Sequence, residues 1–155
     1  MKAKVKVRVM KQGRLPESID KGEWVDLCVA EETKIKAYDW TYVPLGVAMQ
    51  LPAGYEAYIA PRSSTWKNFG IISCNSLGII DNCYCGNNDE WKFPALAFRD
   101  TELHAGQRVC QFRITLSQKA TMWQKIKWLF TSGIEFEQVD VLLSGDRGGF
   151  GSTGV

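Results

Sequence analysis

Two aspartates stand in strand-like stretches where a charge is unexpected. Asp26 lies inside WVDLCVA and Asp81 lies inside LGIIDNCYCG. The only histidine, His104, lies in the polar turn RDTELHAGQR, so a histidine triad or a multi-histidine metal site is nearly excluded, and acid–base chemistry falls to carboxylates. Because a buried, unpaired carboxylate is costly, each aspartate is either held by a neighbouring arginine or turn amide, or used in chemistry. The residues alone leave both interpretations open.

Donors that suit a phosphate follow two apolar runs. PRSS, residues 61–64, places Arg62, Ser63 and Ser64 where the run YEAYIA ends, which gathers a guanidinium, hydroxyls and free backbone amides at one point. In GQRVCQ, residues 106–111, Arg108 and Gln111 project to opposite faces of an expected strand. One of them can therefore support the fold while the other reaches a ligand. Short patterns of this kind also occur by chance.

The glycine-rich end RGGFGSTGV, residues 147–155, admits two interpretations, a floppy tail or a working segment. Glycines let backbone amides approach an anion closely, and Arg147, Ser152 and Thr153 add charge and hydroxyl donors. Phe150 adds a flat face that can cover a base. Such a segment can be mobile when empty and ordered over a ligand, so the composition favours a working segment.

The overall composition predicts one soluble domain. The chain has 155 residues and a formal net charge of +2, which gives no large field for gripping nucleic acid or an anionic membrane. MKAKVKVRVM has no uninterrupted apolar stretch and is interpreted as an edge strand of a cytoplasmic protein. Five cysteines without a secretory signal indicate reduced thiols. Cys83 and Cys85 form the one close pair, which favours two strand cysteines over a zinc site.

These groups must be positioned by strands. Short apolar or alternating runs, separated by Gly, Pro, Asn and Asp, predict an all-β sandwich or jelly roll. They cover residues 2–9, 24–30, 42–51, 55–60, 78–81, 92–99 and 107–116. Only TMWQKIKWLF, residues 121–130, has helical spacing, and it predicts a short amphipathic helix that packs on the sheet or presents an interaction surface. We expect a domain over residues 1–143 and a mobile arm over residues 144–155.

In this order, five stretches resemble the trimeric dUTPase family: VDLCVAEE (25–32), APRSST (60–65), NSLGIIDNCYCG (75–86), GQRVCQ (106–111) and RGGFGSTG (147–154). The resemblance implies a jelly-roll (β-clip) subunit of a homotrimer, with active sites at subunit interfaces closed by C-terminal arms. The implied reaction is Mg²⁺-dependent hydrolysis of dUTP to dUMP and pyrophosphate, which lowers dUTP and supplies dUMP for thymidylate synthesis. The implied partners are dUTP, dUMP and two further copies of the chain, with neither nucleic acid nor membrane.

The resemblance also implies a role for each candidate residue. Asp81 corresponds to the general base that activates the attacking water, and Asp26 to the carboxylate that holds a water of the magnesium shell. Arg108, together with Arg62, braces the site. Asn75 and the hairpin backbone read uracil, Tyr84 packs beneath the deoxyribose, and Phe150 stacks over the base. The implied substrate-binding residues are Arg62, Ser63, Ser64, Asn75, Ile79, Ile80, Tyr84, Gln111, Arg147, Phe150, Ser152 and Thr153.

The sequence departs from the family pattern at Ser64, where glycine is commoner, in NNDEWKF after Gly86, which is longer and more polar than the usual hairpin, at Arg147 and in the helix at 121–130. Arg147 stands three residues before Phe150, so relative to the phenylalanine the arginine is displaced by two positions from its usual place. The helix at 121–130 has no counterpart in the minimal pattern. Two other functions therefore stay open: a dCTP deaminase, which shares the fold, and a nucleotide-gated regulatory protein that uses the helix to bind a partner.

Overall fold

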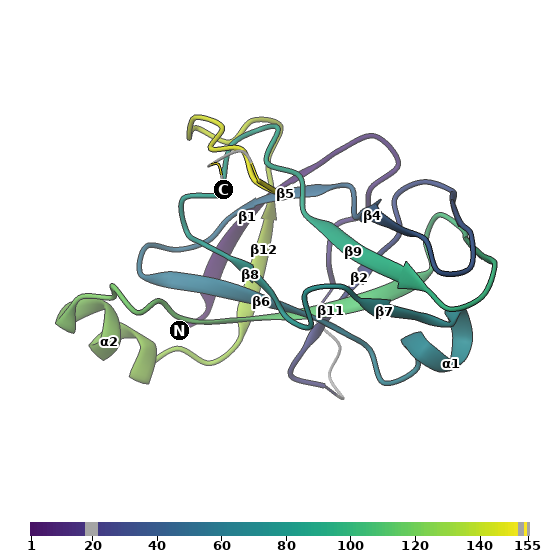
Figure 1. The fold of residues 1–155 in the computed structure, drawn as a ribbon. Helices are drawn as coiled ribbons and strands as arrows, with labels where there is room; N and C mark the ends of the chain where they lie inside the picture. The colour runs from purple at the N-terminus through teal and green to yellow at the C-terminus, as the bar shows by residue number, and fades with distance from the viewer. Residues whose placement is uncertain (18–21, 152–153, 155) are drawn as a thin grey trace.

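The computed structural model describes residues 1–17, 22–151 and 154. Within them, twelve strands and two short helices follow one another along the chain (Figure 1). Each predicted apolar run contains at least one strand, so the all-β prediction is confirmed. The elements are β1 Ala3–Val9, β2 Val25–Cys28, β3 Thr33–Ile35, β4 Trp40–Pro44, β5 Val47–Gln50, β6 Tyr55–Pro61, α1 Thr65–Phe69, β7 Ile71–Ser73, β8 Gly78–Ile80, β9 Lys92–Ala97, β10 Thr101–Leu103, β11 Arg108–Leu116, α2 Met122–Leu129 and β12 Ile134–Gln138.

The N-terminal strand is not an edge strand. β1 is the middle strand of a three-stranded sheet, with β5 antiparallel on one side and β12 parallel on the other. The edge prediction was wrong. The lysines of β1 alternate with the buried residues Ala3, Val5 and Val7, so the lysine side chains point away from the core. In that direction they leave both backbone edges of β1 free to pair with other strands. β12, which comes from the last quarter of the chain, covers one edge of β1, and β5 covers the other.

A four-stranded sheet in the order β2-β11-β6-β8 carries most of the candidate site. β11 is its longest strand and pairs antiparallel with both β2 and β6, while β6 also pairs with β8. The buried residues of β6 and β11 alternate with more exposed ones, as the period of a half-buried strand requires. This sheet therefore brings segments from the first half and the last third of the chain side by side.

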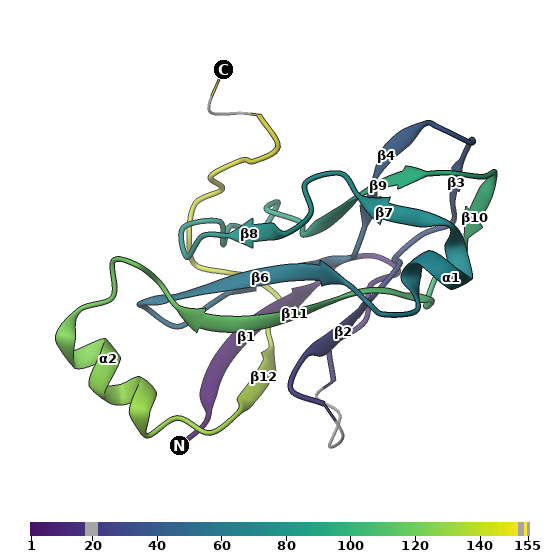
Figure 2. The ribbon, with the colours of Figure 1, turned by 60° about the horizontal axis from the view of Figure 1, so that its bottom comes forward.

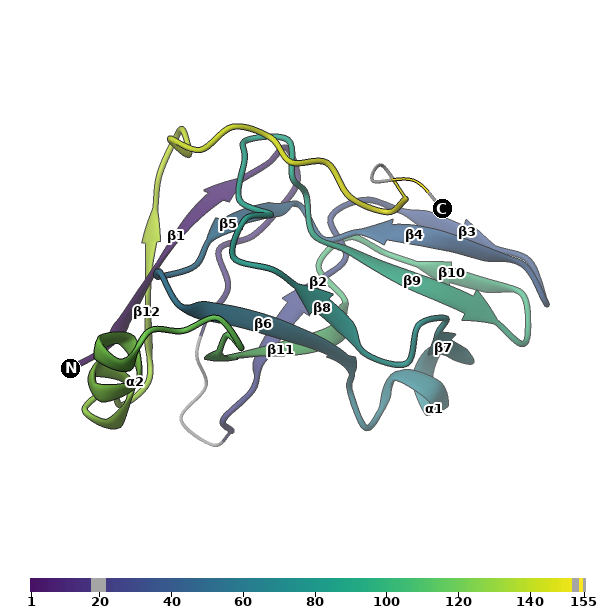
Figure 3. The same cartoon turned by 60° about the vertical axis from the view of Figure 1, so that its left-hand side comes forward.

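A second group of strands lies over this sheet. β4, β9 and β7 form a three-stranded antiparallel sheet, and β3 pairs with β10. Figure 2 shows β4, β7 and β9 in a layer above β6 and β11, and Figure 3 shows β4 and β9 above them from another side, an arrangement that fits a jelly-roll-like subunit. The core between the layers contains large apolar side chains, and the fully buried Trp91 packs edge-to-face on Phe112 with 5.2 Å between ring centroids.

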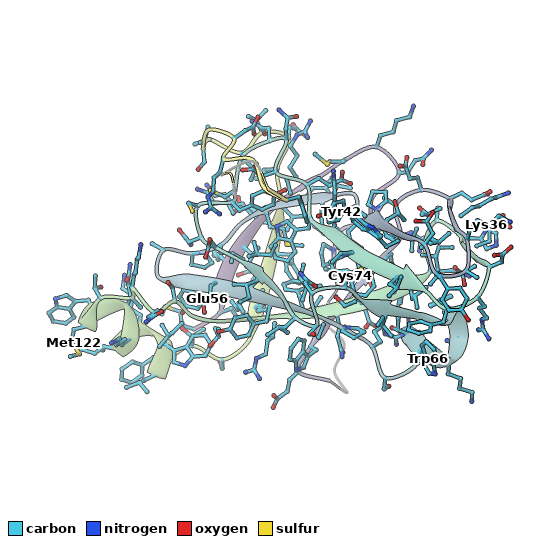
Figure 4. All side chains as sticks on the ribbon, viewed as in Figure 1. Lys36, Tyr42, Glu56, Trp66, Cys74 and Met122 are labelled. Atoms are coloured by element: carbon cyan, nitrogen blue, oxygen red, sulfur yellow. The ribbon has the colours of Figure 1, made fainter. Side chains whose placement is uncertain are left out.

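Helix α2 forms as predicted but packs differently. Thr121 caps its N-terminus in a capping box with Gln124, yet none of the helix residues is buried. Trp128 contacts the body, 5.3 Å from Tyr55 between ring centroids. Met122, at the tip of the helix in Figure 4, and Trp123 are 70% and 75% exposed. The expectation that the apolar face covers the sheet was therefore wrong for most of that face.

No helix in the part of the chain that the structure describes is long and apolar enough to span a membrane.

Candidate functional site

One set of candidate residues gathers on β2, β11 and the end of β6, and we call it the strand group: Asp26, Arg62, Ser63, Ser64, Arg108 and Gln111. The pairing register of these strands explains why the residues lie close together. Gln111 on β11 lies opposite Asp26 on β2 and opposite Ala60 on β6, so the segment that begins at Pro61 starts beside both. The Gln111 side-chain amide donates to the carbonyl of Pro61 at 3.2 Å. Three stretches distant in sequence thus form one surface.

Two arginines hold the carboxylate of Asp26. Arg62 Nε donates to one oxygen at 2.7 Å, and Arg108 Nη1 donates to the other at 3.0 Å. The Asp26 side chain is only 12% exposed, against 22% for Arg62 and 54% for Arg108. A second nitrogen of Arg62 donates to the Ser64 hydroxyl at 3.3 Å. Asp26 is thus an ionic partner inside a polar network, and its oxygens keep capacity for further hydrogen bonds.

Thr65 ties the PRSS segment to the sheet, a role that sequence reasoning missed. Its hydroxyl accepts the backbone N–H of Arg62 at 2.9 Å and donates to the carbonyl of Val109 on β11 at 2.8 Å. Helix α1, also not predicted, begins at Thr65 after the N-cap Ser64. Thr65 is buried, while Ser63 is exposed and faces solvent. The stretch therefore presents its serines from a fixed turn, and the sequence signal was the threonine that ends APRSST.

The second set lies at the other end of the same sheet, around β8, and we call it the hairpin group: Asn75, Ile79, Ile80, Asp81 and Tyr84. The turn before β8 places Ser76 at φ 60°, and the Ser73 hydroxyl donates to the side-chain oxygen of Asn75 at 2.7 Å. Asn75, Ile79 and Ile80 line a hollow of about 50 Å³ together with Phe150. That space holds a few water molecules but no nucleoside.

Tyr84 is fixed and neutral. The ring is buried, and its hydroxyl donates to the carbonyl of Glu90 at 2.8 Å. Burial, helped by the nearby charges of Asp89, Glu90 and Asp146, raises the pKa of Tyr84 to about 12. The phenol therefore stays protonated at physiological pH and offers an apolar ring rather than a negative charge.

The arm joins the hairpin group. Arg147 Nη1 pairs with the Asp81 carboxylate at 3.1 Å, and the Asp81 side chain is 53% exposed. Phe150 packs against Tyr42 with 4.6 Å between ring centroids, and Lys92 Nζ lies 5.7 Å from the centre of the Phe150 ring. Tyr42 and Cys74, both labelled in Figure 4, line one pocket together with Phe150. Ser152 and Thr153, also predicted to bind substrate, lie outside the described residues.

The structure does not bring the two groups together. Over residues 1–17, 22–151 and 154, no side-chain hydrogen bond or ion pair joins the strand group to the hairpin group or to Arg147. All five cysteines are free thiols in this structure. In the same residues, Glu32, Glu102 and His104 form an exposed cluster of three metal-type ligands.

Three residues near the hairpin group were missed. Asp89, Lys92 and Tyr42 contact the arm, but NNDEWKF looks like an ordinary polar turn and Tyr42 like an ordinary strand residue. The close approach of Gly149 to the Tyr84 ring was missed as well. A Cβ added at Gly149 would lie 2.8 Å from that ring. These contacts arise from the fold of the arm over the hairpin, which no local pattern encodes.

Comparison with known proteins identifies the family. The dUTPase family model matches residues 24–127. An SPbeta prophage-derived deoxyuridine 5'-triphosphate nucleotidohydrolase of Bacillus subtilis (strain 168) is 47% identical over 155 residues, 100% of this chain and 99% of the relative. A deoxyuridine 5'-triphosphate nucleotidohydrolase of Finegoldia magna is 36% identical over 124 residues, 77% of this chain and 75% of the relative.

Solved structures have the same fold. The dUTPase of Streptococcus mutans superimposes with a TM-score of 0.67 at 26% identity, and the match covers 75% of this chain and 98% of that one. A mutant dUTPase of phage phi11 of S. aureus, which coordinates a structural Mg(II) ion, superimposes with a TM-score of 0.66 at 16% identity, over 76% of this chain and 94% of that one. With the family model and a relative that matches over its full length, the chain belongs to the dUTPase family.

Proposed function

We propose that this chain hydrolyses dUTP to dUMP and pyrophosphate, as a homotrimer that uses Mg²⁺. One observation carries the proposal: an accessible carboxylate, Asp81, stands directly after a strand whose residues line a small hollow with Asn75 and Phe150. The hollow can select a base while the carboxylate faces the reacting phosphate. The full-length relationship to a nucleotidohydrolase named for deoxyuridine 5'-triphosphate supports the same substrate.

Base and sugar recognition follow from the hairpin group. The Asn75 amide and the backbone of β8 offer both donors and acceptors, as the edge of uracil requires. Ile79 and Phe150 supply apolar surface for the faces of the base. Because the hollow is too small for a base as it stands, Phe150 must shift when substrate enters and then cover it. The neutral Tyr84 ring lies nearby and supplies the surface for a sugar that lacks a 2′-hydroxyl.

Asp81 has the position of a general base. A water molecule attacks the α-phosphorus and loses its proton to the Asp81 carboxylate. A new oxygen–phosphorus bond forms, the bond from the α-phosphorus to its bridging oxygen breaks, and pyrophosphate leaves. Arg147 Nη1 donates to one oxygen of this carboxylate at 3.1 Å, and the carboxylate keeps capacity to accept a hydrogen bond from the water. If the guanidinium leaves Asp81 when substrate binds, it becomes available for phosphate, which gives the shortened spacing to Phe150 a use.

The strand group fits a magnesium ion held through water. Both Asp26 oxygens already accept a guanidinium at 2.7 and 3.0 Å, so direct coordination would compete with the arginines, whereas their remaining lone pairs can accept a metal-bound water. When bound, Mg²⁺ supplies charge to neutralise the phosphates. Ser63, Ser64 and Gln111 donate to the phosphate oxygens, and Arg62 and Arg108 keep Asp26 in place.

A trimer completes the site. The hairpin group has a base pocket and a carboxylate but few phosphate donors. The strand group has several phosphate donors but no base pocket. A neighbouring copy can bring its strand group to this hairpin group, and rotational symmetry repeats the pairing until the ring closes. Exposed aromatic side chains such as Trp40 and Trp66, 54% and 53% accessible, provide apolar area for such contacts. Five free cysteines favour a reducing compartment, the cytoplasm.

The exposed face of α2 favours a second role, nucleotide-dependent binding of a regulatory partner. Leu129 and Phe130 are 78% and 71% exposed, and neighbouring large apolar side chains as exposed as these are typical of a surface that binds another protein. Removing residues 119–132 would leave hydrolysis in place but abolish partner capture. An unchanged set of captured proteins would remove this role from consideration.

The test is to incubate the protein with dUTP, dTTP, dCTP and UTP, each with Mg²⁺ and with chelator, and to measure pyrophosphate and ammonia. We expect metal-dependent pyrophosphate release from dUTP only, and a much slower rate for a chain truncated after Leu143. Ammonia release from dCTP would replace the proposal with a deaminase. Binding of dUTP without release would move the regulatory role to first place. Sedimentation of the same sample tests the trimer.

A further inference from the structure

The turn after β8 carries Asp81, and its backbone decides where that carboxylate lies. β8 ends at Ile80, and the Tyr84 N–H donates to the Asp81 carbonyl at 3.0 Å, which closes a tight turn over residues 81–84. The Asp81 side chain is 53% exposed, and within the described residues its carboxylate has one side-chain partner, Arg147. The position of the carboxylate therefore depends on the backbone of the turn.

Asn82, the next residue, ties this turn to another part of the fold. Its side-chain Nδ2 donates to the carbonyls of Leu51 and Pro52, at 3.3 and 2.8 Å. Both acceptors belong to the turn between β5 and β6, 31 and 30 residues earlier in the chain. Nδ2 carries two N–H groups, so each of its donors has an acceptor. Asn82 therefore uses its amide nitrogen for the fold and not for a ligand.

The turn that accepts these bonds is itself fixed. Leu51 and Tyr55 are buried, with 4% and 5% of their surface exposed. The Pro52 carbonyl also accepts the Tyr55 N–H at 3.2 Å, and the Gly54 carbonyl accepts the Ser117 N–H at 2.8 Å. These bonds join the turn to the start of β6 and to the segment that follows β11. Asn82 is thus bonded to a well-ordered part of the molecule.

Asp81 is therefore held on both sides. On one side, Ile80 is the last residue of β8 and pairs with Ala57 on β6. On the other side, Asn82 is bonded to the turn between β5 and β6. A single residue between two fixed neighbours has few backbone conformations, so its carboxylate is placed accurately in spite of its exposure. A catalytic group that is placed in advance loses little conformational freedom in each turnover.

We propose that Asn82 is a positioning residue for the general base, which holds the Asp81 turn against the turn between β5 and β6. Asn82 touches neither dUTP nor the attacking water in this role, and it acts through the backbone of Asp81. The effect on turnover rests on the proposed dUTP hydrolysis, whereas the hold on the turn can be measured without substrate.

Two substitutions remove this hold in different ways. Asn82→Asp keeps the shape of the side chain but replaces both N–H donors by an oxygen, which would face two carbonyl oxygens. Asn82→Ala removes the side chain beyond Cβ. Asn82 is only partly buried, so Asn82→Ala keeps the fold even if Asn82→Asp does not. Asn68→Ala, at an exposed residue of α1, is the matched control.

Hydrogen exchange measures the hold on the turn. The Tyr84 N–H is protected by its bond to the Asp81 carbonyl, so its exchange rate reports how often the turn opens. We expect exchange to be about tenfold faster in both Asn82 variants, because loss of a hydrogen bond of ordinary strength shifts an opening equilibrium by about this factor. Asn68→Ala should exchange at the wild-type rate. Unchanged exchange of Tyr84 in the folded Asn82 variants would overturn the hold.

Turnover tests the link to the general base. The kcat for dUTP should fall about 10- to 100-fold in the Asn82 variants, because a misplaced catalytic group costs about this much. KM should change less than about twofold, since the hollow lined by Asn75 and Ile79 is untouched. Equal kcat for Asn82→Asp and wild type would overturn the positioning role.

A double variant separates positioning from a general structural role. If Asn82 acts only through the general base, Asn82→Ala should cost nothing further in a chain that already carries Asp81→Asn. An equal fractional loss of the residual activity in that chain would show that Asn82 acts elsewhere, and would overturn the assignment. A wild-type chain that does not hydrolyse dUTP would instead overturn the proposed function, while the exchange measurement would still decide the hold on the turn.

Discussion

The strand group and the hairpin group are built in opposite ways. The strand group consists of side chains on paired strands, and its central carboxylate, Asp26, is tied by two arginines and shielded from water. The hairpin group has an exposed carboxylate, Asp81, whose ion pair comes from the arm. One half is organised before any ligand arrives, whereas the other is completed by a segment with no regular secondary structure from residue 145 to 149.

This difference distinguishes residues that the protein needs for stability from residues that it needs for catalysis. A group that the fold needs must be paired in the empty protein, and its substitution disturbs folding. A group that reacts must be reachable by water, and its substitution leaves the fold intact. Substitutions in the two groups should therefore have different signatures, and the following experiments test that contrast.

Asp81→Asn should have the largest effect on rate. Removal of a general base costs about 10² to 10⁴ in turnover, and we expect a loss of about 10³ with dUTP affinity largely retained. Because Asp81 is 53% exposed, the melting temperature should stay within about 1 °C, as is usual for surface substitutions. Pyrophosphate release, titration calorimetry and thermal unfolding measure the three quantities. Turnover equal to wild type would remove Asp81 from the mechanism.

Asp26→Asn should affect both properties. Two guanidinium groups lose their anion in a site where Asp26 is 12% exposed, which should cost about 2 kcal/mol and lower the melting temperature by about 4–8 °C. Loss of a group that orients metal-bound water costs about 10- to 100-fold in activity.

Glu102→Gln is the matched control for Asp26→Asn, because Glu102 pairs with Lys34 on the surface, where the side chains are 44% and 70% exposed. It should change stability by less than about 0.5 kcal/mol. Equal melting temperatures for the two variants would contradict the contrast between the groups.

The contrast also explains which features the sequence could predict. Strands with alternating residues were recognised, because burial on one face leaves a period of two. Asp26 and Asp81 were singled out because a charge inside such a run is anomalous, whatever its use. The five family-like stretches singled out residues on β2, β8 and β11, in the turns beside β6 and β8, and in the arm, although the sequence could not divide them into two separate groups.

The features that escaped prediction depend on distant contacts. β1 was taken for an edge strand because its parallel partner, β12, lies more than a hundred residues away. Helix α1 has only five residues, too few for a helical period to be read. The α2 pattern gave an apolar face but not what covers it. Asp89 looked like a turn residue, since its three amide partners meet only after the arm has folded back.

Gly149→Ala should produce the smallest effect and sharpen the comparison within the arm. A methyl group at this position would lie 2.8 Å from Tyr84 Cε2, and the Tyr84 ring is buried, with its hydroxyl bonded to Glu90. Because that ring cannot retreat easily, the arm should move instead, and kcat/KM for dUTP should fall about fivefold with the melting temperature unchanged.

Gly145→Ala isolates the cause of this effect, because a Cβ there would meet no atom within 4 Å. It removes the same backbone freedom near the start of the arm without the contact, and it should retain full activity. If both alanines reduce kcat/KM equally, the arm needs flexibility rather than a close fit against Tyr84. If only Gly149→Ala reduces kcat/KM, the arm docks on the hairpin group through the close contact with Tyr84. The contacts between the arm and the hairpin group are then as specific as those within the strand group.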